Sequence, residues 1–359
     1  MPERQKILAS AAAFIIAAAL SPQIAGAWFV NQANVAIAHA ASVPQDAPQR
    51  STDLNDAEND LTSARVLSND GRVLLAQARF FLARGDPSGS VRSFDQADAW
   101  LQSDPIAQFV WAEAARESNQ PGVAIDHWRV AGAYVYFSQQ MHRAMDGHQW
   151  QAAEAYARVA VAIEPNSPDA HRVLGDALSQ QKIDNDESLG ELDRARELTR
   201  DPELLSTIIS RKGEILASRN EAQQALDQFD QARAVAPLDA RPRTDYAMTL
   251  LKLRPEATAQ GVALLNQVVS DSPWYTAAYV ALANISETGG DPKGAESWLS
   301  QGLVRNPNNP ELLFALGQFY ARQQRVAEAR TTLVQALSFE THADNLELIA
   351  TALAGVPRP

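Results

Sequence analysis

The sequence predicts an all-α protein built as a solenoid of stacked helix pairs. Apolar residues recur at the 3.6-residue helical period along most of the 359-residue chain. A pattern of small residues and prolines starts at Thr276 and repeats from Pro310, a spacing of 34 residues. Hydrophobic residues make up 46% of the chain and charged residues 21%, which is typical of a folded protein rather than a disordered one.

The N-terminal segment, residues 1–40, is a predicted signal peptide or transmembrane anchor that begins as a hydrophobic helix. Arg4 and Lys6 are followed by a stretch without Asp, Glu, Lys or Arg that lasts through Gln45. The apolar run from Ile7 to Leu20 after a basic start is typical of a signal peptide. Small residues at 25 and 27 form a cleavage pattern that would release a chain beginning at Trp28.

The same segment also fits an anchor. Ile7 to Val30 spans 24 residues, which is long enough for a tilted transmembrane helix. A helix buried within a soluble protein is disfavoured because the charge-free stretch is so long. In both favoured alternatives the basic start stays inside. We therefore expect a membrane-anchored protein whose body is extracytoplasmic or, after cleavage, a secreted or periplasmic protein.

Residues 41–70 are a predicted linker. Ala41 to Asp60 is rich in Pro, Ser, Asp, Asn and Gln. Such a composition buries too little apolar surface to offset the entropy that ordering costs. We expect a mobile tether that becomes helical after Leu54.

Residues 71–343 are predicted to form about eight consecutive helix pairs. A small residue in the first helix, such as Ala283 or Gly317, lets the second helix approach closely, and Leu299 or Leu333 on the second helix fills the remaining space. A proline after the second helix stops it. The repeated pattern begins at Gly71, Pro105, Tyr134, Pro168, Ser206, Ala240, Thr276 and Pro310.

Local signals support these boundaries. Asp86-Pro87 and Asp291-Pro292 each place an N-cap aspartate before a proline at the first helical position, at the turn between the two helices of a pair. Asp344 to Ala354 is one more amphipathic helix. Within residues 344–359 it is predicted to cap the end of the stack, as solenoids require.

Over about residues 71–357 this pattern resembles the tetratricopeptide repeat (TPR) family. The resemblance implies a right-handed superhelix in which the first helix of each pair, helix A, lines the concave face and the second, helix B, the convex face. It also implies that a protein or peptide partner binds in the concave groove. The Lys and Asn pattern with which some TPR domains hold a C-terminal carboxylate is absent, which disfavours a chaperone-tail adaptor.

Carried over to this sequence, the groove-facing positions hold a mixture of arginine, carboxylate, amide and aromatic side chains. Such a mixture suits an extended peptide, since polar groups pair with its backbone and aromatic rings anchor its side chains. The predicted partner-binding residues are Phe109, Glu113, Arg116, Arg172, Asp176, Arg211, Glu214, Asn284, Phe314, Gln318 and Arg322. We expect that reversing Arg172 and Arg211 to Glu abolishes partner binding and leaves folding unchanged.

Composition and motifs exclude several other classes of function. The net charge of −12 disfavours a nucleic-acid binder, which needs a basic surface. The chain has no cysteine, which excludes disulfides and thiolate metal sites. Phosphate-binding loops, zinc-protease motifs and nucleophile elbows are absent from the sequence. We therefore predict no enzymatic activity, no catalytic residues, no cofactor and no metal.

The predicted function is a protein–protein interaction scaffold of the cell envelope that supports assembly of a membrane-associated complex. Its expected contacts are a protein or peptide partner in the groove and the membrane through the N-terminal helix. Two alternatives stay open at this point: a cleaved, soluble exported protein that binds a small or polymeric ligand such as a glycan, and an accessory subunit of a membrane enzyme.

Overall fold

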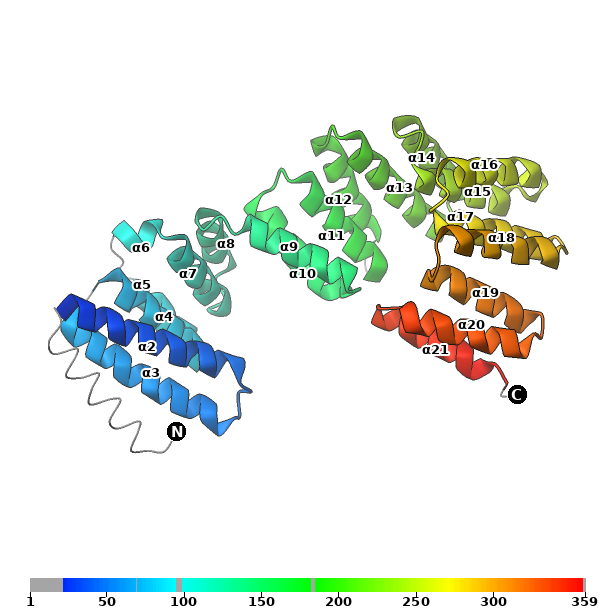
Figure 1. Cartoon of the computed structure of the whole chain (residues 1–359). Coiled ribbons are helices and arrows are strands. Elements are labelled where there is room, and N and C mark those ends of the chain that lie inside the picture. Colours follow the sequence, from blue (N-terminus) through cyan, green and yellow to red (C-terminus); the bar gives the residue numbers. More distant parts are fainter. Residues whose placement is uncertain (1–21, 69, 95–98, 182–184, 358–359) are drawn as a thin grey trace. The chain divides into compact units, whose positions relative to one another are not determined.

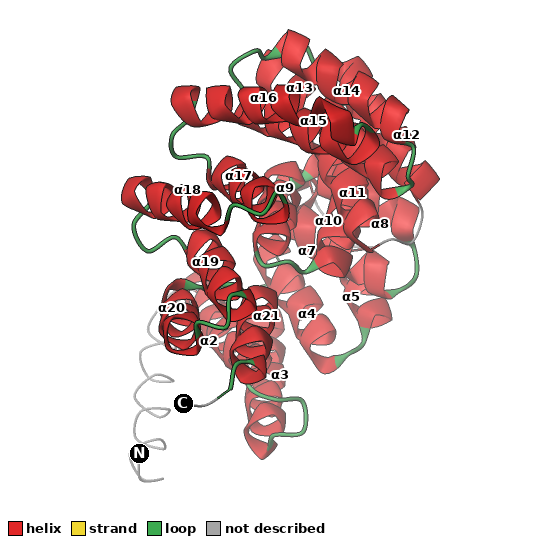
Figure 2. Ribbon diagram, turned by 90° about the vertical axis from the view of Figure 1, so that its right-hand side faces the viewer, coloured by secondary structure: helices red, strands yellow, loops and turns green. Residues whose placement is uncertain are grey.

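The structure is a computed structural model and describes residues 22–68, 70–94, 99–181 and 185–357. The regular elements in these ranges are helices, most of them in antiparallel pairs joined by short turns (Figure 1; Figure 2). The chain divides into two compact units, and the division falls within α9 and α10. The first unit runs to Phe137 and includes Ala162–Pro165, whereas the second comprises Ser138–Val161 and Asn166–Pro359.

The predicted helix pairs are present, and seven of the eight begin at the predicted residue; α13 begins four residues earlier. The pairs are α4 (Gly71–Arg84) with α5 (Pro87–Phe94), α7 (Pro105–Glu117) with α8 (Pro121–Val130), α9 (Tyr134–Asp146) with α10 (Trp150–Ile163), α11 (Pro168–Gln181) with α12 (Asn185–Leu198), α13 (Pro202–Ser218) with α14 (Ala222–Val235), α15 (Ala240–Leu253) with α16 (Thr258–Asp271), α17 (Thr276–Thr288) with α18 (Pro292–Arg305), and α19 (Pro310–Arg322) with α20 (Val326–Phe339).

Three further elements accompany the pairs. A short helix α6 (Ala99–Ser103) precedes α7, and a 3-10 turn η1 (Pro255–Ala257) lengthens the connection before α16. The predicted C-terminal capping helix is α21 (Ala343–Gly355), which packs on α20 and buries Ile349.

Close packing within a pair depends on the predicted small residues. A Cβ atom at Gly213 would lie 2.5 Å from the ring of Phe229 on the partner helix, and one at Gly317 would lie 2.7 Å from Leu333. Both contacts are far below the van der Waals distance, so only glycine lets the two helices approach this closely. The small-then-large pattern read from the sequence is thus confirmed as the interface between helix A and helix B.

The turns within the pairs share a recurrent geometry. The side chain of Asp86 accepts a hydrogen bond from Gly89 N at 2.8 Å, and that of Asp291 accepts one from Gly294 N at 2.9 Å, which confirms both predicted N-caps. A residue one or two positions after the end of helix A often has a positive φ, a conformation that glycine and asparagine adopt at low cost. This position is occupied by Gly85, Asn119, His148, Asn220, Gly290 and Gln324.

The N-terminal part of the described chain is a further helix hairpin. Helix α2 (Pro22–Ser42) packs antiparallel on α3 (Pro48–Leu67), and both contact α4 (Figure 1). Val30, Ala33 and Ile37 of α2 are buried with Ala57 and Leu61 of α3 in one apolar cluster. The hairpin therefore belongs to the core of the first unit.

The prediction of a mobile linker over residues 41–70 is wrong at the start of α3 (Pro48–Leu67), whereas the helix expected after Leu54 is present and already begins at Pro48. The segment is polar overall, but Leu54, Ala57, Leu61 and Ala64 recur at helical spacing and face α2 and α4. A narrow apolar stripe is enough to bury a helix that packs on two neighbours, so the bulk composition was misleading.

The signal peptide or anchor was predicted for residues 1–40, and the structure describes this segment from residue 22 onward. The apolar run Ile7 to Leu20 lies outside the described residues. From Pro22 onward, the chain is in α2, where Ala25, Gly26 and Val30 are buried against protein. In the part of the chain that the structure describes, none of the helices combines the length and apolarity needed to cross a bilayer.

Candidate functional site

In the second unit, the A helices form a continuous layer. Each of them contacts its own helix B, and α11, α13, α15, α17 and α19 also contact one another in succession. Residues at the same position of successive repeats therefore lie on neighbouring A helices. The face that this layer presents is called the A-helix face below.

A chain of charged side chains begins at α9 and α11. His142 Nε2 lies 2.8 Å from an Asp169 carboxylate oxygen, and Arg172 donates to the other oxygen at 2.7 Å. Burial alone would raise the pKa of Asp169, but the hydrogen bonds from His142 and Arg172 outweigh it and lower the pKa to about 2. The hydrogen bond with Asp169 in turn raises the pKa of His142.

The chain continues across α11 and α13 through a buried carboxylate. Asp176 is only 3% exposed, and Arg172 donates a second hydrogen bond to its Oδ2 at 2.9 Å. Arg211 Nε lies 3.5 Å from Asp176 Oδ1 and donates through another nitrogen to Glu214 at 2.7 Å. Burial raises the pKa of Asp176 against the opposing effect of the two arginines.

On α15 the same face carries Arg241 and Asp245. Arg241 lies 3.8 Å from Glu214, a distance at which the two charges attract without a short hydrogen bond. Burial and the nearby charge of Glu214 raise the pKa of Asp245 to about 7, although Arg241 and Arg211 act in the opposite direction. Tyr275, before α17, is close enough that burial and then the charge of Asp245 raise its pKa to about 12.

Several buried polar atoms on these helices have no hydrogen-bond partner among the described residues. Among them are Asp176 Oδ1, Ser210 Oγ, Arg211 Nε, Thr244 Oγ1 and Asp245 Oδ2. Ser210 is fully buried and Thr244 is 3% exposed. Native proteins usually satisfy nearly all such groups, because an unbonded buried polar atom costs about 1–3 kcal/mol. These residues, with Arg172, Glu214 and Arg241, are called the α11–α15 polar cluster.

Four of the predicted partner-binding residues meet in this cluster: Arg172, Asp176, Arg211 and Glu214. The pairing corrects one expectation. Arg172 and Arg211 provide the positive charges that face buried Asp176. Reversing both to Glu would therefore leave three like charges together, so the reversal is not neutral for folding.

Other predicted residues lie on α17 and α19 of the second unit. Asn284 is exposed, and Arg322 is exposed and pairs with Glu287 at 2.7 Å. Phe314 and Gln318 are half-buried, and Phe314 packs against the apolar cluster under α21. Phe314 is thus mainly a core residue.

The remaining predicted residues belong to α7 in the first unit. The ring of Phe109 meets Tyr136 edge-on at 5.4 Å. Arg116 is exposed and pairs with Glu113 at 3.0 Å, and with Glu117. These contacts form a local surface network of their own.

Sequence reasoning missed several members of the cluster. Ser210, Thr244 and Asp245 were overlooked, as was the bond between His142 and Asp169. A usable signal existed, since Thr244 and Asp245 follow Ser210 and Arg211 after one 34-residue repeat. Whether a hydroxyl finds a partner depends on tertiary contacts, which one sequence does not contain.

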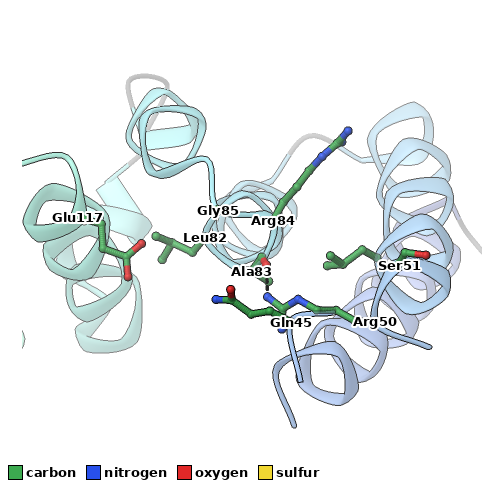
Figure 3. Close-up of a pocket in the computed structure, with 9 residues that line it drawn as sticks. Gln45, Arg50, Ser51, Leu82, Ala83, Arg84, Gly85 and Glu117 are labelled. Carbon is green, nitrogen blue, oxygen red and sulfur yellow. Dashed lines mark hydrogen bonds between the residues drawn. The ribbon is translucent and has the colours of Figure 1, made fainter. Parts of the chain in front are cut away.

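Two other kinds of site, a metal site and a ligand pocket, find little support among the described residues. They contain no group of three or more His, Asp or Glu side chains placed to hold a metal ion. A pocket in the first unit is lined by Arg50, Arg84 and Glu117 among others (Figure 3). There, Arg50 donates to the carbonyl oxygens of Ala40 and Ala83, which close the ends of α2 and α4, so this cation has a structural role.

Comparison with known proteins supports the repeat assignment. Residues 288–347 match a tetratricopeptide repeat family model, so this part of the chain carries the repeat. A tetratricopeptide repeat protein from Parabacteroides merdae matches with a TM-score of 0.50 at 13% identity, covering 79% of this chain and 98% of that one. At this identity the similarity shows the fold alone: an all-α array of TPR-like helix pairs.

Two smaller solved proteins are also similar. PilF from Pseudomonas aeruginosa matches with a TM-score of 0.43 at 13% identity, covering 61% of this chain and 97% of that one. PilW, a type IV pilus biogenesis factor, matches with a TM-score of 0.44 at 17% identity, covering 61% and 98%. No curated protein sequence matches the chain significantly.

Proposed function

We propose that this TPR-like protein is a non-enzymatic scaffold that binds an extended segment of a partner protein along the A-helix face of α11, α13 and α15. The observation that carries this proposal is a row of partly exposed charged side chains on neighbouring A helices: Arg211 is 26% exposed, Glu214 35% and Arg241 40%. Arg172 on α11 continues the row, so an extended chain can pair with charged groups on three helices.

A peptide is the ligand whose chemistry fits best. Each residue of an extended chain offers an N–H donor and a C=O acceptor at short intervals. The partly exposed members of the cluster offer the carboxylate of Glu214 as an acceptor and the guanidinium groups of Arg211 and Arg241 as donors. Successive A helices repeat these groups along the array, so one extended segment can engage several of them.

A glycan ligand finds less support in the positions of the aromatic rings. Phe109 already packs against Tyr136, and Phe314 packs against the core under α21. Both of these predicted binding rings are half-buried and already contact other side chains of the protein.

The test uses a photoreactive amino acid, benzoylphenylalanine, placed at single positions of the full chain in its native host. Met248 is 39% exposed and follows Thr244 and Asp245 by one turn of α15. Val304 on α18, a B helix, is 77% exposed and provides the matched control.

We expect irradiation to give a discrete adduct from position 248 and none from position 304, with the partner peptide identified by mass spectrometry. An adduct from position 304 alone, or from neither position, would contradict binding on the A-helix face.

We further propose that the scaffold acts outside the cytoplasm and supports assembly of a membrane-associated complex. The support is the composition of residues 7–45, which contain no Asp, Glu, Lys or Arg. Cleavage before Trp28 would remove only the start of α2 and leave Val30, Ala33 and Ile37 in the apolar cluster. Intact mass and membrane fractionation of the native protein separate a cleaved chain from an anchored one. A full-length chain in the cytosolic fraction would contradict both forms.

A further inference from the structure

We infer that one side of α2 lies on a lipid bilayer, with the helix axis along the membrane surface and the apolar side chains of that side among the upper acyl chains. This side is called the α2 outer face and consists of Ile24, Ala27, Trp28, Asn31, Val35 and Ala38. The inference rests on the membrane-anchored form of the proposed function and adds a lipid contact made by the folded body.

The α2 outer face is opposite to the side of α2 that packs on protein. Ile24, Trp28 and Val35 follow one another at intervals of 4 and 7 residues, which places them on one side of a helix. They are 53%, 37% and 60% exposed, and they form a stripe about 16 Å long at 1.5 Å per residue. Ala33 and Ile37 lie on the other side and are buried in the apolar cluster with α3 and α4.

The composition of α2 is unusual for a helix that faces water. It contains no Asp, Glu, Lys or Arg, and the only polar residue of the α2 outer face is Asn31. A surface helix normally carries charged and polar residues opposite its buried stripe, whereas a helix that is apolar on both sides is covered on both. We therefore infer that the α2 outer face is covered by an apolar partner.

The neighbouring helix α3 shows what a solvated helix face looks like in the same unit. Its exposed residues include Asn55, Asp56, Glu58 and Asn59. The missing charge is thus a property of α2 alone. Because α2 brings no cation and α3 adds carboxylates beside it, the contact depends on burying apolar side chains and gains nothing from anionic headgroups.

The chain before α2 indicates that the covering partner is a bilayer. The apolar run Ile7 to Leu20 contains no charged residue and is separated from Pro22, the first residue of α2, by Ser21 alone. In the anchored form this run enters the bilayer, so α2 begins at the membrane surface. Tryptophan is enriched at that surface, and Trp28 lies on the α2 outer face.

The packing of α2 fixes how it meets the lipid. α2 lacks the combination of length and apolarity needed to cross a bilayer, and one of its sides is held by α3 and α4. A helix of this kind lies in the plane of the interface and buries only its outward side. The anchored run and α2 then form two successive membrane contacts, the second of which orients the first unit.

The test measures whether lipid reaches the α2 outer face. Because the chain has no cysteine, one introduced cysteine can carry an NBD fluorophore at a chosen position. Val35→Cys labels the α2 outer face, and Asn59→Cys labels an exposed position of α3 as the matched control. Each full-length labelled chain is reconstituted into phosphatidylcholine vesicles with and without lipids that carry a nitroxide on the upper acyl chain. We expect the nitroxide to quench the label at position 35 at least threefold more than the label at position 59.

Two further substitutions tie the quenching to this face. Asn31→Glu adds a charge one turn before position 35 and should lower the quenching there at least threefold. Asn55→Glu adds the same charge at an exposed position of α3 and should leave it unchanged. Neither residue belongs to the apolar cluster, and thermal melting shows that both variants are folded. Anionic phosphatidylglycerol in the vesicles should not increase the quenching.

Flotation of the vesicles separates the inference from the proposed function. If the chain floats with the vesicles but positions 35 and 59 are quenched equally, or if Asn31→Glu has no effect, the inference is overturned and the anchored form stands. A label at position 35 that is already shielded before lipid is added, and that the nitroxide does not reach, shows that a protein segment covers the face and also overturns the inference. If the chain does not float, both the anchored form and the inference fail.

Discussion

The α2–α4 region of the first unit and the α11–α15 region of the second use opposite means to hold neighbouring helices together. In α2–α4, an apolar cluster forms the contact, and polar side chains such as Asp53 and Arg50 have close partners. In α11–α15, charged groups are buried between A helices, and several of their atoms lack hydrogen bonds. The first arrangement buries apolar surface, whereas the second buries charged and polar groups at a cost in stability.

The largest expected effect comes from removing the cations that face Asp176. Reversing Arg172 and Arg211 to Glu should lower the free energy of unfolding by at least about 3–5 kcal/mol, because a buried carboxylate loses its counter-charges. Urea unfolding measures this change. Arg194→Glu, at an exposed pair with Glu197, should cost less than about 1 kcal/mol. A double variant with the wild-type midpoint would show that the charges of α11–α15 are dispensable.

The next effect tests the apolar side of the comparison. Ile37 of α2 is 7% exposed, and Ile37→Ala should lower the free energy of unfolding by about 2–4 kcal/mol because it leaves a cavity against α3 and α4. Val35 on the same helix is 60% exposed, so Val35→Ala is the matched control and should have little effect. Calorimetry and limited proteolysis of the hairpin provide the measurement. Equal melting of the two variants would mean that α2 does not belong to the folded core.

The third effect is pH-dependent and specific to α11–α15. The raised pKa of Asp245, about 7, means that the folded state holds a proton that the unfolded state releases near pH 4. The stability that this bound proton contributes is fully present below about pH 4 and is lost as the pH rises through about 7. Asp245→Asn should therefore match the wild type near pH 4 and exceed it by up to about 3 kcal/mol at pH 8, allowing for partial solvent access.

Urea unfolding at both pH values gives this comparison. A constant difference between Asp245→Asn and the wild type from pH 4 to pH 8 would contradict the assigned burial of the charge.

The smallest effect separates stability from binding. Ser210→Ala and Thr244→Val each remove a buried hydroxyl that has no hydrogen bond, so each should raise the free energy of unfolding by about 1 kcal/mol. Neither hydroxyl reaches the surface, so both variants should leave the adduct formed from position 248 unchanged. Ser90→Ala on α5 removes an equally buried, unbonded hydroxyl outside the A-helix face, and it should stabilise the chain without changing the adduct. Loss of stability in Ser210→Ala would indicate that its hydroxyl is bonded after all.

Much of the fold was predictable because its rules are local. The helix starts, the Asp86 and Asp291 caps and the contact of Gly213 with Phe229 all follow from spacing within one repeat. The hairpin α2–α3 was not recognised, because charge-free and polar stretches suggest a membrane segment and a linker when each is read alone. Their narrow apolar stripes predict a helix hairpin only when the two helices are considered together.

The candidate site was predictable only in part. Arg172, Asp176, Arg211 and Glu214 were identified from their positions in helix A. That they neutralise one another, and that Asp245 lies beside them, depends on side-chain geometry between helices from different repeats. Pair distances and unused hydrogen bonds are three-dimensional quantities, and the sequence pattern constrains them weakly.

The helices at the two ends of the array have a consequence for how copies of this chain associate. α2 and α3 cover the first repeat helix α4, and α21 covers α20, with Ile349 and Val356 buried beneath it. An array with bare terminal faces could add further copies head to tail, because every added copy would bury the same surface. Among the described residues, α4 and α20 are covered by the chain's own helices, so a further copy cannot stack on these two repeat helices as another repeat would.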